Sequence, residues 1–308
     1  MTLLLTRGDL EAVLEPEACL AVLREGFRAA ADAPVPGQRV RTDLPFPGTA
    51  TALLPGVLPG IEAYTVKVNA KFPGARPALR GVVCLHSGRD GELLALLDSA
   101  TVTAWRTGLA AALGTHVLAG AADVLGVVGA GAQAELMVRG LAALRGPREL
   151  VVHDTDPDRA AAFAARHGGR VLASAPGVAA AAGIVLLATW SREPLLRLAD
   201  IGEGRHLTSL GADEPGKREL AADLLAAALL VVDDRELAAA MGALAVPGLH
   251  ADATLGEVLR GEHPGRAGAA ARTVYAPVGL PWQDLALAWL AYEQAGRKGA
   301  GQRVDLLS

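Results

Sequence analysis

Between residues 124 and 232, short runs that are apolar at nearly every position alternate with longer stretches of helical character. The strand-like runs are Val124–Val128, Leu150–His153, Ile184–Ala188, His206–Leu210 and Leu229–Val232. Helical stretches precede or separate them at Ala100–Gly120, from residue 132 to about Leu144, and at Ala160–Arg166. Strand–helix–strand order with fully apolar strands is typical of a doubly wound parallel sheet.

The first hundred residues follow another pattern. Glu17–Ala31 carries apolar residues at helical spacing, and short apolar runs bounded by Pro and Gly follow it. These runs include Ala63–Asn69, Gly81–Leu85 and Glu92–Leu97, the last two joined by a hairpin-like turn at Ser87–Gly91. They predict a mainly antiparallel sheet.

The chain of 308 residues has the length of about two domains. We expect an α/β protein in which residues 114–272 form a doubly wound Rossmann domain. Residues 1–113 together with 273–308 would form an α+β domain. The tail contributes a helix, Asp284–Ala295, whose apolar face we expect in a core or an interface.

Composition limits the classes of function. Hydrophobic residues make up 51% and charged residues 20%, and the formal net charge is −4. This composition suits a packed core and not a disordered chain, and it does not favour general electrostatic binding of nucleic acid or of an anionic membrane. The uncharged span Val171–Ser191 is interrupted by Pro176-Gly177, so we interpret it as a helix and a buried strand. No signal-peptide core follows Met1, and we therefore expect a soluble, cytoplasmic protein.

Metal binding has little support in the sequence. Cys19 and Cys84 are too few for a disulfide framework or a zinc site, and each is best interpreted as a small buried hydrophobe. The seven histidines never lie four residues apart or close to the cysteines. We expect no metal.

A glycine-rich turn carries the first candidate site. Gly129-x-Gly131-x-x-Ala134 lies between a buried strand and a helix, where glycines permit a tight turn and the helix N-terminus offers N–H groups to a pyrophosphate. Asp154 ends the next strand, where a carboxylate receives ribose hydroxyls. Carboxylates at Asp154 and Asp156 favour NAD over NADP, although Arg159 leaves NADP possible. A purely structural turn is the alternative.

Lone charges in apolar surroundings form the second candidate site. Lys67 and Arg106 lie in core-like segments, and a buried charge needs a partner. That partner would be an acidic residue in an ion pair or an anionic ligand. Arg41 lies on a predicted strand. For any one of the three taken alone, a solvated surface role is the better interpretation.

The segment Gly211–Glu219 is the third candidate. It follows a predicted strand of the parallel sheet, at the carboxyl end where such sheets hold their ligands. A charged turn without a ligand is the alternative.

Together these pieces resemble the ornithine cyclodeaminase/mu-crystallin family, from about Arg41 to about Tyr292. The motifs that carry the resemblance are Lys67-x-Asn69 with Pro73, Thr103–Gly108, Gly129–Ala134, Ala188-Thr189, Gly211-Ala212-Asp213-x-Pro215-Gly216-Lys217-x-Glu219, Gly256–Leu259 through Gly265-Arg266, and Val278-Gly279 before Asp284. The Gly-Ala-Asp-x-Pro-Gly-Lys stretch is the most specific of them.

The resemblance implies a role for each matching position. Arg41 and Arg106 would bind the substrate carboxylate, Lys67 would hydrogen-bond the carboxylate or the departing group, and Asp213 would be the catalytic acid/base. Val278 and Gly279 would also contact substrate. The remaining implied positions would bind the cofactor: Gly129, Gly131, Ala132, Gln133 and Asp154 for the adenosine half, and Arg106, Thr107, Thr189, Leu207, Leu210 and Lys217 for the nicotinamide half.

The resemblance implies an NAD(P)-dependent oxidoreductase that moves hydride between nicotinamide and Cα of an amino or imino acid. Ornithine cyclodeaminases carry a glutamate near the diamine side chain, where this chain has Ala52 and Leu54. An unpaired ammonium there would be costly, so we favour a small or apolar substrate, as in alanine dehydrogenase or cyclic ketimine reductase. Pro277 and Ala78 stand where the family often has hydroxyl residues.

Two alternatives remain. One is an ornithine cyclodeaminase that converts L-ornithine to L-proline and ammonia. The other is a mu-crystallin-like nucleotide-binding protein with little turnover. The resemblance also implies a homodimer, with residues 1–113 and 273–308 as the substrate-binding and dimerisation domain.

Overall fold

The computed structural model describes residues 1–30, 40–46, 49–72, 75, 78–146, 149–212, 214 and 216–306, without the side chains of Val40, Arg41 and Ala50. These residues form two compact units, one of residues 1–107 with 280–308 and one of residues 108–279. The boundary lies inside helix α3 (Ser99–Leu118), between Thr107 and Gly108.

The first unit contains a seven-stranded sheet of order β15-β1-β6-β5-β4-β3-β2. Its strands are β1 (Thr2–Leu5), β2 (Val40–Asp43), β3 (Ala50–Gly56), β4 (Ala63–Lys71), β5 (Leu79–Ser87), β6 (Leu93–Asp98) and β15 (Gln302–Val304). Neighbouring strands are antiparallel except β1 and β6. The predicted mainly antiparallel sheet is confirmed, with the expected hairpin between β5 and β6.

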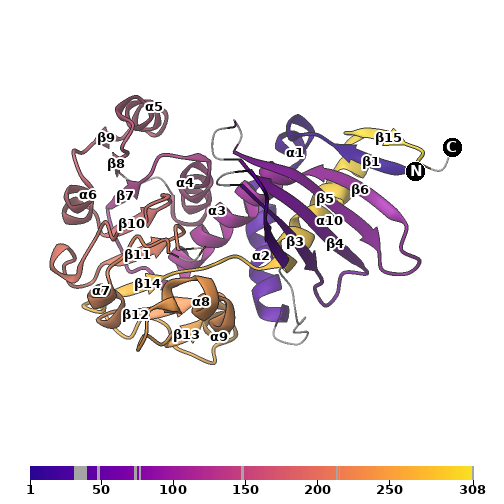
Figure 1. The fold of residues 1–308 in the computed structure, drawn as a ribbon. Coiled ribbons are helices and arrows are strands. Elements are labelled where there is room, and N and C mark those ends of the chain that lie inside the picture. Colours follow the sequence, from indigo (N-terminus) through magenta and orange to yellow (C-terminus); the bar gives the residue numbers. More distant parts are fainter. Residues whose placement is uncertain are drawn as a thin grey trace. The chain divides into compact units, whose positions relative to one another are not determined.

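Three helices cover one face of this sheet: α1 (Arg7–Val13), α2 (Pro16–Ala29) and α10 (Pro281–Lys298), as Figure 1 shows. Helix α10 packs against β3, β4, β5 and α2. At Gly26 the two helices approach so closely that the ring of Trp282 fills the space a side chain would need. Leu285 and Ala288 are buried, whereas Trp289 and Tyr292 are half-buried, so the expected apolar face of the tail helix does contribute to the core.

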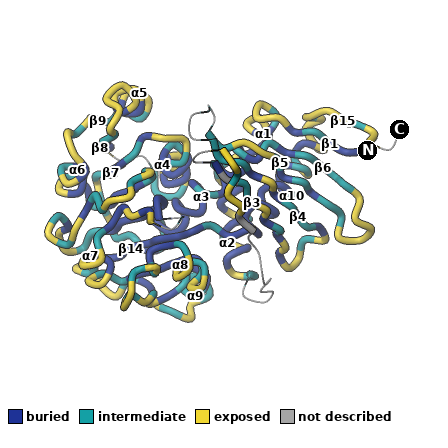
Figure 2. The backbone as a smooth tube through the Cα atoms, in the orientation of Figure 1, coloured by how far each residue is buried: buried dark blue, intermediate teal, exposed yellow. Residues whose placement is uncertain are grey.

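The opposite face of the sheet is apolar but incompletely covered. Figure 2 colours each described residue of these strands by its burial. Alternation along β4 sends Thr65 and Lys67 inward and leaves Val66 half-buried and Val68 exposed. Leu53, Val68 and Val82 lie in register across β3, β4 and β5. The side chains of Leu53 and Val68 remain 43% and 36% exposed.

The second unit contains an eight-stranded sheet in which every described pairing is parallel, of order β13-β12-β14-β11-β10-β7-β8-β9. Its strands are β7 (Val124–Val128), β8 (Glu149–His153), β9 (Arg170–Val171), β10 (Ile184–Leu187), β11 (His206–Ser209), β12 (Leu229–Val232), β13 (Ala253–Thr254) and β14 (Thr273–Tyr275).

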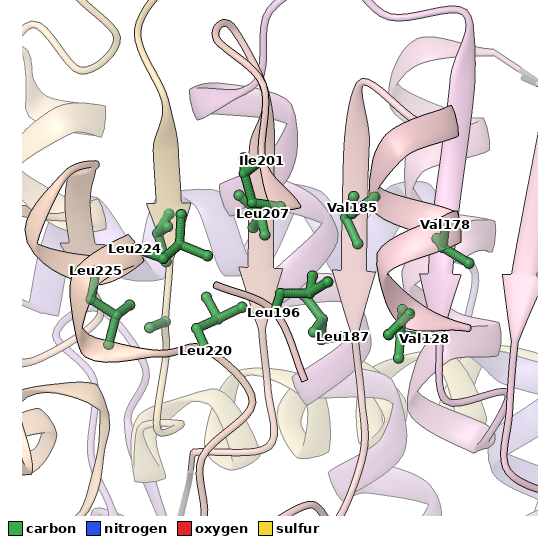
Figure 3. Close-up of a cluster of buried hydrophobic side chains, with 14 of the residues drawn as sticks. Val128, Val178, Val185, Leu187, Leu196, Ile201, Leu207, Leu220, Leu224 and Leu225 are labelled. Carbon is green, nitrogen blue, oxygen red and sulfur yellow. The ribbon is translucent and has the colours of Figure 1, made fainter. Parts of the chain in front are cut away.

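Helices lie on both faces of this sheet. They are α4 (Ala132–Arg145), α5 (Pro157–His167), α6 (Ala175–Ala181), α7 (Ala222–Ala226), α8 (Arg235–Met241) and α9 (Leu255–Arg260), with the 3₁₀ turns η2 (Leu198–Asp200) and η3 (Ala243–Ala245). On one face, residues of α6 and α7 pack with strand residues such as Val185 and Leu207 (Figure 3). On the other, α3, α4 and α5 pack against Leu125, Val127 and Leu186. This is the predicted doubly wound architecture.

The uncharged span of residues 171–191 contains α6 and β10, as expected from its composition. Within the residues described here, no helix has both the length and the apolarity needed to cross a membrane.

A fully buried histidine joins two strands of the parallel sheet. His206 Nδ1 lies 2.7 Å from Thr273 Oγ1 on β14, and its Nε2 lies 2.9 Å from Thr208 Oγ1. Burial lowers the pKa of His206 to about 3, and the charges of Arg266 and Arg145 add to this shift. The imidazole is therefore neutral in the folded protein.

Candidate functional site

The glycine turn follows β7 as predicted. Gly129 has a φ of 91°, and a Cβ there would lie 2.7 Å from the carbonyl oxygen of Ala188. Only glycine permits both this conformation and this approach. Gly131 is the N-cap of α4 and has open space where its side chain would be. Ala132 and Gln133 begin the helix, and no side chain caps it. This helix N-terminus has the geometry that binds phosphate.

Asp154 directly follows β8 and reaches back to the glycine turn. Its Oδ2 accepts a hydrogen bond of 2.7 Å from Ala130 N, and its Oδ1 accepts one of 2.9 Å from Asp156 N. Arg159 binds both oxygens, at 3.1 and 2.9 Å. Burial acts to raise the pKa of Asp154, but the hydrogen bonds and Arg159 outweigh it and hold the pKa below its ordinary value. The carboxylate is charged, and the Arg159 guanidinium beside it is 51% exposed.

The turn lies where the sheet changes direction. Strands β7 and β10 are neighbours, and the chain continues from β7 to β8 on one side and from β10 to β11 on the other. Gly129 approaches Thr189 after β10, with a Cβ position 2.9 Å from its Cγ2. Ligands of open parallel sheets bind outside the carboxyl ends of the strands at such a point.

A buried glutamate ties the ends of β10 and β11 together. Oε1 of Glu219 accepts bonds from the backbone N–H and the hydroxyl of Thr189, at 2.6 and 2.7 Å. Oε2 accepts bonds from Ser209 Oγ and Gly211 N, both at 2.7 Å. Burial raises the pKa of Glu219 above its ordinary value, and the four donors oppose that shift. The hydroxyl of Thr189 also accepts from Ser191 N, so protein groups already engage it.

A second buried carboxylate ties β12 to the segment after β14. Asp233 accepts hydrogen bonds from Val278 N at 3.0 Å and from Gly279 N at 2.6 Å. Burial raises the pKa of Asp233, while these backbone donors act to lower it. The backbone of Val278 and Gly279, a predicted substrate contact, is thus held by a residue from a neighbouring strand.

Lys217 and a pocket lie beyond β11. The ammonium of Lys217 is 3.9 Å from Glu214 Oε2 and 4.9 Å from the centre of the Trp190 ring. A cavity of about 220 Å³ lies beside it. Its wall combines polar residues between 209 and 219 with residues from the end of α8 through η3. Among them are Ser209, Lys217, Glu219, Met241, Gly242 and Ala243.

The first unit buries two of the predicted cations, Lys67 and Arg106. Lys67 on β4 is 1% exposed, and its Nζ donates to Asp284 Oδ2 at 2.7 Å and to Thr103 Oγ1 at 3.3 Å. Arg106 on α3 is 8% exposed; its Nη1 donates to Gln283 Oε1 at 3.2 Å, and its Nε lies 3.4 Å from Asp284 Oδ1. The fold therefore brings Lys67 and Arg106 to one acidic residue at the start of α10. We call Lys67, Arg106, Gln283 and Asp284 the cation cluster.

Other predicted residues have varied surroundings. Leu207 is in the hydrophobic core of Figure 3 with no exposed surface, and Leu210 packs in the core on the opposite face. The hydroxyl of Thr107 is buried and has no hydrogen-bond partner among the described groups. Cofactor contacts of these three residues stay predictions.

Two predicted residues lie partly or wholly outside the described part of the structure. Arg41 is on β2, paired in register with Ala52, but its side chain is not described. Asp213 is not among the described residues. Their roles in substrate binding and in acid/base chemistry stay predictions.

The sequence reasoning assigned no role to Asp284, Glu219 or Asp233. A signal was present for Asp284, because it shares a helical face with Ala288, Ala291 and Ala295, all buried. A carboxylate on a buried stripe needs a cationic partner. Asp233 is bound by backbone N–H groups, and Glu219 by backbone N–H groups and two hydroxyls, all from other segments of the chain. No sequence pattern indicates these partners.

The described residues contain no group of three or more His, Cys, Asp or Glu side chains that could hold a metal ion. Cys19 is buried as expected, whereas Cys84 is half-buried.

One unit has a doubly wound sheet with a glycine turn at its switch point, and the other unit buries two cations. This combination defines the class of two-domain dinucleotide-binding proteins. Comparison with known proteins agrees with this class. The ornithine cyclodeaminase/mu-crystallin family matches residues 1–299. The chain belongs to this family.

Among the relatives, an alanine dehydrogenase of Archaeoglobus fulgidus is 29% identical over 322 residues, covering 98% of each chain. A structure of an archaeal alanine dehydrogenase dimer with bound NAD has a TM-score of 0.90 at 27% identity, covering 99% of each chain. The Δ1-pyrroline-2-carboxylate reductase of Thermococcus litoralis, in complex with NADH and L-proline, has a TM-score of 0.91 at 27% identity. That match covers 98% of this chain and all (100%) of the other.

Proposed function

We propose that this protein is an NAD-dependent oxidoreductase that transfers hydride between nicotinamide and Cα of a small or apolar amino or imino acid. One observation carries the proposal. This chain, a member of the family, has a dinucleotide-type turn in its second unit and buries two cations, Lys67 and Arg106, in its first unit. The relatives named above are an alanine dehydrogenase and an imine reductase, in agreement with this chemistry.

The residues of the second unit fit a dinucleotide. The uncapped N-terminus of α4 suits the pyrophosphate, and the open position at Gly131 leaves room for it. Asp154 suits the adenosine ribose, as the charged carboxylate that ends the adjacent strand. When bound, a nicotinamide cofactor supplies the hydride chemistry.

The chain's own residues bind and orient the substrate. Guanidinium and ammonium groups at Arg41, Arg106 and Lys67 hold the carboxylate, which aims Cα–H for hydride transfer. Asp213 accepts the proton of the amine during oxidation and returns it during reduction. The first unit would then be the substrate domain and the second the nucleotide domain.

Ornithine cyclodeamination is less well supported. Strands β3 and β4 contain no Asp or Glu, and Leu54, at the position that would meet a diamine, is buried beside Lys67 in the sheet register. A second ammonium group would have no acidic partner on these strands and would stay costly to bury.

A paired assay on the purified protein tests the function. One arm supplies NADH with pyruvate and ammonia, or with pyrroline-2-carboxylate; the other supplies ornithine with catalytic NAD. We expect NADH consumption in the first arm and no proline in the second. Proline formed without net change in NADH would instead establish a cyclodeaminase.

Two variants sharpen the assay. Asp213→Asn should abolish turnover while NADH still binds, because the amine proton then has no acceptor. Asp223→Asn, at an exposed aspartate of α7, is the matched control and should keep turnover. If the wild type binds NADH but reduces neither imino acid, the nucleotide-binding alternative with little turnover replaces our proposal.

We also propose a homodimer formed through the open face of the first unit's sheet. An apolar row crosses five strands in register through Leu4, Leu96, Cys84, Val66 and Pro55, all half-buried. Together with Leu53, Val68 and Val82 it makes an apolar surface of the kind that marks protein interfaces. A cytoplasmic location stays a prediction from the sequence.

A further inference from the structure

An exposed tryptophan follows β10 at the carboxyl edge of the parallel sheet. Trp190 comes directly after Thr189 and is 58% exposed. Among the described residues of the second unit it is the most exposed large apolar side chain, and Val171 follows at 46%. An indole is usually covered, because leaving its large apolar surface in water is unfavourable. An exposed indole at the edge where such sheets hold their ligands is therefore a candidate ligand contact.

Strand order places Trp190 on a defined side of the glycine turn. In the order β11-β10-β7-β8, the turn follows β7, between the other two ends. Asp154, the predicted ribose contact, follows β8 on one side, and Trp190 follows the segment Ala188-Thr189 after β10 on the other. A Cβ on Gly129 would lie 2.9 Å from Thr189 Cγ2, so the residue before the tryptophan touches the turn. A dinucleotide with its pyrophosphate at the turn and its adenosine at Asp154 extends its nicotinamide half toward β10.

The backbone on both sides of Trp190 is held by the segment after β11. Before the tryptophan, Thr189 N donates to Glu219 Oε1 at 2.6 Å. After it, Ser191 O accepts from Arg218 N at 3.1 Å. Because both neighbours are fixed, a ligand that contacts Trp190 does not have to order a loose loop, which is one of the usual costs of binding.

A lysine lies over the indole ring. Lys217 Nζ is 4.9 Å from the centre of the Trp190 ring, within the range of a cation–π contact. Lys217 is itself buried, so the ring shares its surroundings with a cation that water hardly reaches. The lysine occupies one face of the indole, and the rest of the indole provides the exposed surface. This surface is flat and apolar, and its position is set by the contacts on both sides.

We infer that Trp190 binds the nicotinamide half of the dinucleotide, with its indole as a flat apolar wall against the nicotinamide nucleoside. The inference rests on the proposed function, since it takes the second unit as the nucleotide domain. It adds a contact beyond Thr189 and Lys217, the residues already expected near this half of the cofactor. A planar ring placed against the indole removes apolar surface of both partners from water.

NADH and ADP test this contact, because ADP shares the adenosine half and the pyrophosphate and lacks the nicotinamide nucleoside. Calorimetry on the purified protein gives both dissociation constants, and the ratio for NADH over ADP is compared among variants. Trp190→Ala should raise the ratio about tenfold, as expected for the loss of one stacked ring, and should leave ADP binding unchanged. Trp190→Phe keeps an aromatic surface and should retain most of the NADH affinity.

Trp289→Ala is the matched control. It removes the same side chain from α10 of the first unit, where the Trp289 ring lies 5.9 Å from that of Tyr292. The ratio should stay at the wild-type value. A general loss of stability would weaken NADH and ADP together, so the ratio separates a nicotinamide contact from instability.

Fluorescence quenching reports on the indole itself and not on Lys217. Oxidised NAD does not absorb tryptophan emission, so it quenches an indole mainly when the nicotinamide ring touches it. NAD should quench part of the emission of the wild type and of Trp289→Phe, and Trp190→Phe should lose that part. ADP, which carries no nicotinamide, serves as the blank.

The outcomes separate the inference from the function. An unchanged ratio in Trp190→Ala, or quenching retained in Trp190→Phe, would overturn the role of Trp190 and leave the function intact in a protein that binds NADH and reduces imino acids. Equal weakening of NADH and ADP would also overturn it. A wild type that does not bind NADH would contradict the proposed function, and the inference with it. A raised ratio together with lost quenching supports both.

Discussion

At the scale of single residues, the contacts of Asp154 and Arg159 determine which cofactor the predicted nucleotide site can bind. Asp154 accepts two hydrogen bonds from backbone N–H groups, two from Arg159 and a longer one of 3.5 Å from the Thr155 hydroxyl. These donors occupy about all of the lone pairs of the carboxylate. A ribose diol can bind this carboxylate only if it displaces the guanidinium, whereas a 2′-phosphate would be attracted to Arg159. The preference between NAD and NADP therefore depends on this arginine as well as on the aspartate.

Arg159→Ala should weaken NADPH binding about tenfold and leave NADH binding unchanged or tighter, because the charge near a 2′-phosphate is lost while the carboxylate oxygens become free. Fluorescence titration of both cofactors measures this. Arg166→Ala, an exposed arginine of the same helix, should change neither constant. Equal losses for both cofactors in Arg159→Ala would show that the arginine does not discriminate between them.

At the scale of elements, buried carboxylates join the carboxyl ends of neighbouring strands. Asp154 links β8 to β7, Glu219 links β10 to β11, and Asp233 links β12 to the segment after β14. Each accepts backbone N–H groups of loops that would otherwise lack partners, which satisfies buried donors and orders the loops. The loops at the ligand-binding edge of the sheet are thus held by the sheet itself.

The buried His206 between β11 and β14 makes stability depend on pH. Its pKa is about 3 in the folded state, against an ordinary value of 6.5 for histidine. The unfolded chain therefore takes up the proton first, and the contribution of His206 is complete above 6.5 and is lost as the pH falls toward 3. Between pH 7 and 4.5 this group should lower the free energy of unfolding by about 2–3 kcal/mol.

Urea denaturation at several pH values measures this dependence. His206→Gln, which retains a donor and an acceptor, should remove that part of the pH dependence, while His250→Gln at an exposed position should keep the wild-type curve. An unchanged slope in His206→Gln would assign the acid sensitivity to other groups.

At the scale of the whole molecule, we expect the open face of the first unit's sheet to determine the oligomeric state. Its apolar residues are contiguous across several strands, unlike the isolated apolar residues that are normal on a protein surface. A second copy of the chain would cover them. Helices cover the other face, so only this side of the sheet remains for pairing through side chains.

Val68→Glu should convert the dimer to a monomer, because a charge at a buried interface centre is costly to desolvate. Light scattering after size exclusion measures the mass. Val171→Glu, the same change at a 46% exposed valine of β9, should remain dimeric. A wild type that is monomeric at all concentrations would refute the proposed dimer.

Much of the fold was predictable because its signals are local. Runs such as Val124–Val128 are apolar throughout, which predicts strands buried on both faces, and Gly129 and Gly131 mark the turn because few other residues permit it. The change from short runs bounded by Pro and Gly to fully apolar runs predicted two domains. The apolar residues of α10 identified a helix face, but its Asp284 was passed over, because the cations that explain it lie 217 and about 180 positions away in the chain.

By itself, the sequence determined the classes of secondary structure, the glycine turn, the acidic end of β8 and the family, since each depends on residue types at short spacing. Only the tertiary structure decided that Lys67 and Arg106 share Asp284 and that Glu219 and Asp233 hold loops from other strands. The physical reason is that buried charges and backbone donors are satisfied by whatever group the fold brings within hydrogen-bonding distance, and that distance does not depend on separation along the chain.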